Sequence, residues 1–263
     1  MTTTAIRHGG FGNATSDMLT MIGRSLRLTR RNGETLFLAI LLPLLMMSMF
    51  VFVFGGAINV GGGEYINYVV PGTILLCVGY GAASTAMAVA DDMNNGMIDR
   101  LRSMPISNLA LLTGHVVASI ARNALSTTIV VGTAIAMGFR PEGSFGDWMV
   151  AVGLLLLYVL ALSWLAAGLG AIAKGVESAS GLAFFMLFLP YLSSAFVPTG
   201  TMPSFLRAVS ENQPITPIIE TIRGLLIGTP IGNNGWIALA WASGLLIFSF
   251  TLSIVLYRLR TTR

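Results

Sequence analysis

Acidic side chains are missing from the long apolar stretches of this sequence. The chain has 11 Asp and Glu residues among 263, and all of them lie outside six apolar runs. The runs cover residues 36–58, 67–90, 109–139, 148–173, 179–198 and 236–257. Proteins that move ions or protons through their own spans usually keep carboxylates there. The pattern argues against such a carrier and predicts that the energy for any transport comes from another protein.

Residue types that bind metals or phosphate are also scarce. The sequence has one lysine, Lys174, one cysteine, Cys77, and two histidines. A phosphate-binding loop ends in Gly-Lys followed by Ser or Thr, whereas Lys174 is preceded by Ala and followed by Gly. We therefore expect no ATP hydrolysis by this chain. Two histidines and one cysteine predict no metal site and no intrachain disulfide.

The sequence is rich in long hydrophobic runs. Hydrophobic residues make up 54% of the chain and charged residues only 10%. Each of the six runs reaches the about 20 residues that a helix needs to cross a hydrocarbon core of about 30 Å. The composition predicts an all-α membrane protein with six transmembrane helices. We expect a cytoplasmic N-terminal segment over residues 1–35 and a single membrane domain over residues 36–263.

The positive charges predict the orientation. With the N-terminus inside, 12 of the 15 Lys and Arg residues lie on the cytoplasmic side, leaving Arg140, Arg207 and Arg223 outside. Loops rich in Lys and Arg usually stay in the cytoplasm, so both termini are predicted to lie there, in a bacterial cytoplasmic membrane. The net charge of +4 then follows from topology, and no basic stripe interleaved with aromatics indicates a nucleic-acid partner.

The segment before the first run has two different faces. On a helix over residues 17–31, one half is apolar and the other half is basic. The apolar half holds Met18, Leu19, Met21, Ile22, Leu26 and Leu28, and the basic half holds Arg24, Arg27, Arg30 and Arg31. This pattern is typical of a helix lying in the membrane interface. Two roles stay open: an anchor on anionic membrane lipids, and an added contact with a cytoplasmic partner.

The loop between the second and third runs, residues 91–107, mixes both signs of charge with apolar residues. Its apolar side chains recur at helical spacing, its charged ones face away, and a proline ends the pattern. The apolar set is Met97, Ile98, Leu101 and Met104, the charged set is Asp99, Arg100 and Arg102, and Pro105 follows. The pattern predicts a short cytoplasmic helix that either rests on the bilayer or docks into the groove of a partner.

The third run contains His115 and Arg122 on one helix face, because seven residues separate them. A helix that starts near residue 109 would place Arg122 at the membrane edge. There we expect it to form an ion pair with Asp91 or Asp92, which follow the second run. We expect His115 to reach the membrane surface without a special role.

Prolines punctuate the segment between the fifth and sixth runs, residues 199–235. Pro203 suits the start of a helix to about residue 212, and Pro217 suits the start of a second helix that Gly228 closes after residue 227. Glu220 and Arg223 are three residues apart on that second helix and are placed to interact. We expect two short helices that dip back toward the bilayer from outside.

Two stretches of the sequence form a pattern that is known from one protein family. The first holds Gly96, Asp99, Arg100, Leu101 and Pro105, and the second holds Met186, Leu189, Leu192, Ser193, Ala195, Met202, Pro203, Pro214, Ile215 and Arg223. Over nearly its full length the chain resembles the membrane subunit of a type-2 ABC exporter, of the daunorubicin-resistance and nodulation-factor permease kind. Pro217 departs from the family pattern, which has Ser, Tyr or a basic residue there.

The resemblance implies partners and roles. Such permeases pair with a second permease subunit, identical or a sister chain, and with two copies of a cytoplasmic ATPase, which holds the ATP and Mg²⁺. The residues that would couple to the ATPase are Gly96, Asp99, Arg100, Leu101, Met104 and Pro105. Arg24, Arg27, Arg30 and Arg31 would belong to the interface helix, and Pro203, Pro214, Glu220 and Arg223 to an outward gate.

Charge-free spans would give a cargo mainly apolar walls. We therefore predict export of a hydrophobic or amphipathic compound, drug-like or lipid-like. Export of a lipid-linked glycan or lipo-oligosaccharide stays open, because four aromatic residues of the fifth run could line a sugar path: Phe184, Phe185, Phe188 and Tyr191. From a different class, a membrane scaffold without transport or an ATP-independent channel also stays open.

Overall fold

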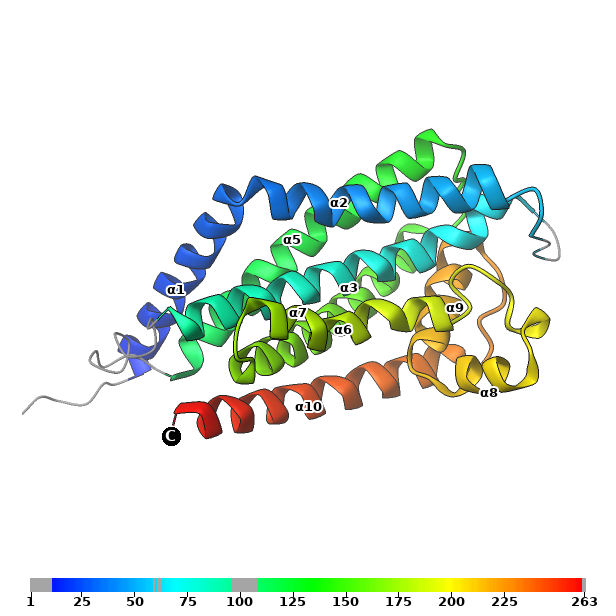
Figure 1. Cartoon of the computed structure of the whole chain (residues 1–263). Coiled ribbons are helices and arrows are strands. Elements are labelled where there is room, and N and C mark those ends of the chain that lie inside the picture. Colours follow the sequence, from blue (N-terminus) through cyan, green and yellow to red (C-terminus); the bar gives the residue numbers. More distant parts are fainter. Residues whose placement is uncertain (1–10, 59, 61–62, 96–107, 262–263) are drawn as a thin grey trace, which may run out of the picture.

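The structure is a computed structural model of the whole chain, and it describes residues 11–58, 60, 63–95 and 108–261 (Figure 1). This part of the chain is helical and contains no strand, which confirms the predicted all-α class. The elements in chain order are α1 (Phe11–Arg31), α2 (Gly33–Ser48), η1 (Met49–Phe54), α3 (Tyr65–Asn94), α5 (Asn108–Ala136), α6 (Phe145–Ile172), α7 (Val176–Phe188), η2 (Leu189–Leu192), η3 (Thr199–Thr201), α8 (Ser204–Asn212), α9 (Ile215–Ile227) and α10 (Asn234–Thr261).

Five helices of the described chain are long and apolar enough to cross a membrane. They are Gly33–Phe54, which joins α2 to the π-helical η1, Tyr65–Asn94, Ala110–Ala136, Phe145–Ile172 and Asn234–Arg260. The fifth run instead forms a shorter apolar helix, Val176–Leu192. Its end has a local cause, since Pro190 has no N–H to donate to the preceding turn and the chain tightens into the 3₁₀ segment η2.

Helix α3 lies at the centre of the bundle. Its most apolar window is 78% buried, whereas the windows of Gly33–Phe54 and Asn234–Arg260 are each 17% buried. Helices α2, α5, α6 and α7 pack around α3, and α10 packs along α6. Figure 1 shows α1 and the C-terminal end of α10 at one end of the bundle, called the terminal end below, and α8 at the opposite end, called the α8 end.

Helix α1 packs on α5 at the terminal end and turns into α2 at a single residue, Asn32. The Asn32 side chain accepts a hydrogen bond from the N–H of Thr35 and so caps α2. The contact between α1 and α5 is close at Gly114, where a Cβ atom would lie 2.9 Å from the carbonyl oxygen of Met21 and 3.0 Å from Ser25 Oγ. The lack of a side chain at Gly114 therefore sets the distance between the two helices.

The segment between the fifth and sixth runs forms two short helices, much as the prolines predicted. Helix α8 follows Pro203 and ends at residue 212, and α9 ends at residue 227 with Gly228 in the left-handed region at φ 77°. Helix α9 begins two residues earlier than expected, after Pro214, and Pro217 falls within its first turn, where a missing N–H costs no helical hydrogen bond. The apolar side chains of α9 are buried against α3, α6 and α10.

Candidate functional site

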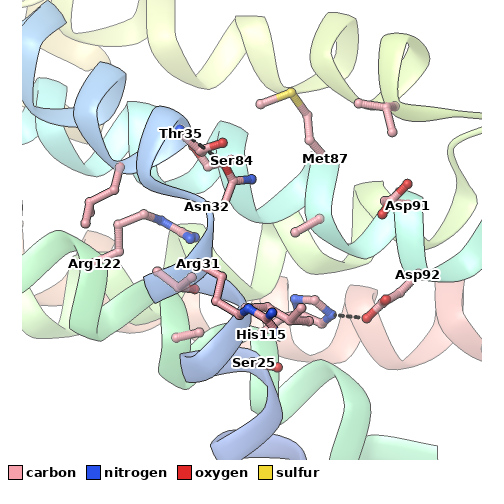
Figure 2. Close-up of a pocket in the computed structure, with 16 residues that line it drawn as sticks. Ser25, Arg31, Asn32, Thr35, Ser84, Met87, Asp91, Asp92, His115 and Arg122 are labelled. Atoms are coloured by element: carbon pink, nitrogen blue, oxygen red, sulfur yellow. Dashed lines mark hydrogen bonds and ion pairs between the residues drawn. The ribbon is translucent and has the colours of Figure 1, made fainter.

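A cavity of about 590 Å³ opens at the terminal end of the bundle. Its walls come from the junction of α1 and α2, from α3, from α5 and from the first residue of α7. Figure 2 shows the polar side chains that line it, which include Arg31, Asn32, Ser84 and Arg122. Apolar side chains, among them Met87, complete the wall. The cavity therefore has a mixed lining with charged groups on opposite sides.

Three charged or titratable side chains form a cluster, called the Asp92 clamp: Asp92 and His115 from one cavity wall, and the partly buried Arg24 behind them. The Arg24 guanidinium donates to both carboxylate oxygens of Asp92, at 2.7 and 2.8 Å. His115 Nε2 lies 2.9 Å from Asp92 Oδ2 (Figure 2). The hydrogen bond to Asp92 raises the pKa of Arg24 above its usual value, which keeps Arg24 charged. The clamp joins α1, α3 and α5 at one point.

Arg122 is buried on the opposite wall, and it does not form the predicted ion pair. Its Nη2 donates to Thr85 Oγ1 at 2.9 Å, with a longer contact of 3.5 Å to the Gly81 carbonyl oxygen. Its Nε has no hydrogen-bond partner, and no acidic side chain within salt-bridge distance is found for it in the described part of the chain. Asp91 is exposed and accepts a hydrogen bond from Asn95 instead.

The partners are set by the register of two antiparallel helices. Seven residues separate His115 from Arg122 on α5, and seven separate Thr85 from Asp92 on α3. His115 therefore meets Asp92, while Arg122 lies about 10 Å deeper, at 1.5 Å per residue, and meets Thr85. The prediction of an Arg122 ion pair with Asp91 or Asp92 was wrong because it placed Arg122 too close to the helix end. The expectation that His115 reaches the membrane surface was also wrong, because its side chain is buried between the helices against Asp92.

Another buried cation lies toward the α8 end. Arg223 donates to Glu220 at 2.5 Å, which confirms the predicted interaction within α9. It also donates to the carbonyl oxygens of Tyr68, at 3.0 and 3.1 Å, and of Ser194, at 2.8 Å. Its guanidinium carbon lies 3.7 Å from the centre of the Tyr68 ring. Arg223 thus fastens α9 to the start of α3 and to the turn after η2. Sequence analysis missed Tyr68, which no local pattern connects to Arg223.

A row of aromatic rings runs along α7 and η2 and reaches η1. The successive ring centroids are 5.6 Å apart for Phe184 and Phe188, 5.9 Å for Phe188 and Tyr191, 5.3 Å for Tyr191 and Phe196, and 4.2 Å for Phe196 and Phe50. This aromatic row contains three of the four aromatic residues predicted to line a substrate path. None of these rings lines the cavity in Figure 2.

Phe185, the fourth predicted aromatic residue, points away from the packed bundle. It is 68% exposed, and Phe184 is 59% exposed. In a single chain, large apolar side chains with this exposure form a surface for lipid or for another subunit. The aromatic row and the cavity are therefore two separate features, both bordered by α7.

Comparison with known proteins identifies the family. The model of the ABC-2 type transporter family matches residues 16–227. The chain belongs to this family. The permease is 29% identical over 248 residues to a daunorubicin resistance ABC transporter permease protein from Streptomyces coeruleorubidus, covering 93% of this chain and 87% of that relative. It is 24% identical over 252 residues to a probable doxorubicin resistance ABC transporter permease protein from Mycobacterium tuberculosis, covering 92% of this chain and 89% of the relative.

The match confirms the resemblance to type-2 ABC exporter subunits seen in the sequence. Proteins of this family are the transmembrane permease subunits of ABC transporters. The residues predicted to couple the permease to an ATPase, Gly96, Asp99, Arg100, Leu101, Met104 and Pro105, lie outside the described residues. The Asp92 clamp borders that segment on both sides, because Asp92 lies near the end of α3 and His115 lies near the start of α5.

The four arginines predicted for an interface helix have different surroundings in the permease. Arg24 is turned inward to Asp92, whereas Arg27, Arg30 and Arg31 are exposed. Arg31 also borders the cavity. The wheel pattern placed all four on one face and gave no sign that one of them has a buried acidic partner. A signal was present in Asp92 itself, since an acidic residue at the end of an apolar helix needs a cation nearby.

Proposed function

We propose that this protein is the permease subunit of an ABC exporter that moves a hydrophobic or amphipathic, drug-like or lipid-like compound out across the cytoplasmic membrane. A separate ATPase subunit supplies the energy. The observation that carries the proposal is the exposed part of the aromatic row, Phe184 and Phe188, beside spans without internal acids. In the five candidate spans, the acidic residues are Glu34, Asp91, Asp92 and Asp147, each close to a helix end. The named drug-resistance relatives support the same substrate class.

In this proposal the conduit runs along one face of the bundle. That face is formed by the exposed sides of α2 and α7. Both helices contact α3, and both expose apolar side chains, such as Phe37 at 59% and Phe185 at 68%. A second permease subunit, identical or a sister chain, covers this face and closes the conduit. Rings of the aromatic row then contact the apolar part of a cargo along its path.

The segment 96–107 is the proposed contact with the ATPase, with Asp99 and Leu101 at its centre. The Asp92 clamp connects both flanks of that segment with α1, so that movement of the segment reaches three helices together. Both termini and this segment lie on the cytoplasmic side in the proposal, which the charge distribution of the sequence supports. The α8 end then faces outward, and α8 and α9 form the outward gate, with Pro203 and Pro214 before them and the Glu220–Arg223 pair within α9.

A transport assay tests the proposal. The permease is reconstituted into inverted vesicles with an ABC ATPase subunit that co-purifies with it, and ATP-dependent uptake of a fluorescent anthracycline, a diacyl lipid and a glycolipid is measured. We expect uptake of the first or second that needs ATP and both subunits. Phe184→Ala combined with Phe188→Ala should lower uptake about tenfold, because two stacked contacts worth about 0.5–1.5 kcal/mol each are lost.

Phe248→Ala is the matched control, since Phe248 is 58% exposed on α10 and lies outside the aromatic row. We expect it to leave uptake unchanged. Uphill transport by the permease without any ATPase would refute the proposal, and so would equal uptake by the double variant and the wild type. Uptake of the glycolipid alone would favour a lipid-linked glycan as the cargo.

A further inference from the structure

We propose that the cavity at the terminal end is a binding site for the phosphate group of a membrane phospholipid. Arg122 is the cation that would hold the phosphate, and the acyl chains would lie along α2. This inference concerns a bound lipid and does not depend on the cargo or on transport. It rests on the cavity, on the unpaired cation in its wall and on the apolar rim beside it.

Arg122 is placed as an anion ligand would need it. Its exposed fraction is 7%, and in Figure 2 the side chain points into the cavity from α5. A buried guanidinium normally pairs with a carboxylate, but the partners found for Arg122 are a hydroxyl oxygen and a backbone carbonyl oxygen. Its Nε donates to nothing. A guanidinium presents five N–H donors in a planar fork that fits two phosphate oxygens, so donors remain for a ligand.

The charges of the remaining cavity lining favour an anion near Arg122. Arg31 lies at the rim. The negative charge of Asp92 is compensated by Arg24 at 2.7 Å. Asp91 is exposed and engaged with Asn95, and Figure 2 shows it on the wall opposite Arg122. Arg122 and Arg31 therefore make one half of the cavity positive, and the carboxylate without a cation partner, Asp91, lies on the opposite wall.

Other donors lie near Arg122. Asn32 caps α2 with its side-chain oxygen, which accepts from Thr35 N–H at 3.3 Å, and its amide N–H groups are left to donate. In Figure 2 Asn32 and Thr35 lie together on the Arg122 side, whereas the Ser84 hydroxyl already donates to the Tyr80 carbonyl oxygen at 3.0 Å. Phosphate oxygens in proteins are held by this combination of guanidinium, amide and hydroxyl donors.

The apolar rim identifies a lipid as the source of the phosphate. Leu28, Leu36 and Val176 line the cavity together with the polar groups, and Leu28 and Val176 are 45% and 42% exposed. On α2, directly after Leu36, Phe37 is 59% and Leu38 42% exposed. This apolar surface continues from the cavity along a helix long enough to cross the bilayer. Basic pockets between spans on one side of a membrane bind lipid head groups in this way.

Native mass spectrometry of the delipidated full-length permease tests the proposal with two lipids that differ only in the phosphate. We expect dioleoyl phosphatidic acid to bind at least about tenfold more tightly than dioleoyl glycerol. Arg122→Gln should abolish the difference, because one charge-assisted contact corresponds to about 10- to 100-fold in affinity. Arg122→Lys keeps the charge and should retain most of it. Arg260→Gln, which removes an exposed charge from α10 at the same end, should change nothing.

A second variant protects the test against misfolding of Arg122→Gln. Ala88 lies in the cavity wall on α3, and Ala88→Phe fills the space while Arg122 stays in place. We expect this variant, too, to lose the tight binding of phosphatidic acid. Retained binding in both Ala88→Phe and Arg122→Gln would overturn the proposal, as would equal affinity of the wild type for the two lipids. Displacement of the lipid by millimolar inorganic phosphate would overturn its assignment to a lipid and leave a site for free phosphate.

Discussion

Asp92→Asn should destabilise the terminal end of the bundle far more than the loss of a surface ion pair does. Asp92 accepts two hydrogen bonds from Arg24 at 2.7 and 2.8 Å and faces His115 Nε2 at 2.9 Å. The side chains of Asp92 and His115 are 12% and 7% exposed. Removing one member of a buried ion pair costs about 3–5 kcal/mol. Because the Arg24 side chain is 28% exposed and can regain water, we expect about 2 kcal/mol for this substitution.

The measurement is the apparent melting temperature of the detergent-purified permease, read by size-exclusion chromatography after heating. About 2 kcal/mol corresponds to a decrease of about 4–8 °C for a chain of this size. The matched control is Glu211→Gln. It breaks the Arg207–Glu211 pair, which has the same 2.7 Å distance but side chains that are 53% and 43% exposed. We expect at most about 2 °C there, because an exposed pair four residues apart on a helix contributes about 0.3–0.5 kcal/mol.

A double-mutant cycle assigns the effect to the contact. Arg24→Gln alone should cost about as much as Asp92→Asn, and the combined variant should cost less than the sum of the two by about 1–2 kcal/mol. Additive losses would show that Arg24 and Asp92 are not coupled. The reasoning would also be refuted if Asp92→Asn lowered the melting temperature no more than Glu211→Gln does. Burial of the ion pair would then add nothing to its contribution to stability.

Three further predictions concern other parts of the permease. Gly114→Leu should lower the melting temperature by several degrees, because a side chain there collides with α1, whereas Gly132→Leu, with open space around it on the same helix, should have little effect. Arg223→Gln should cost about 3 kcal/mol, because it breaks a buried ion pair and leaves two carbonyl groups unpaired, and heating curves will measure the loss. Asp99→Arg combined with Leu101→Asp should abolish transport while ATP hydrolysis continues and the melting temperature stays unchanged, and equal transport would remove this segment from the mechanism.

Helix positions could be predicted well from the sequence, because they depend on apolar length and on proline. Five of the six runs became helices long enough to cross a membrane, and α8 and α9 end at the predicted residues. The fifth run is not confirmed as a full span, since it forms a shorter apolar helix, Val176–Leu192. Its apolar composition continues past Pro190, but the helical hydrogen bonds do not, and composition does not report that difference.

The site could be predicted only in part, because it depends on how two helices are aligned. The sequence indicated that Arg122 and the acids after the second run lie near the same end of the bundle. It did not indicate the register of α3 and α5, in which Asp92 contacts His115 and Arg122 contacts Thr85. The cavity was not predicted at all. Its walls come from five helices, α1, α2, α3, α5 and α7, and no local pattern in any one of them indicates that the five meet.

The matched spacing of polar pairs between α3 and α5 limits how these helices can move. Two polar contacts join the helices, one between Asp92 and His115 and one between Thr85 and Arg122. On each helix, seven residues separate the two contacts. Sliding one helix past the other by a single turn would break both contacts at once. Axial slippage is therefore disfavoured, and a push on the chain between them is transmitted as a tilt or rotation of the pair.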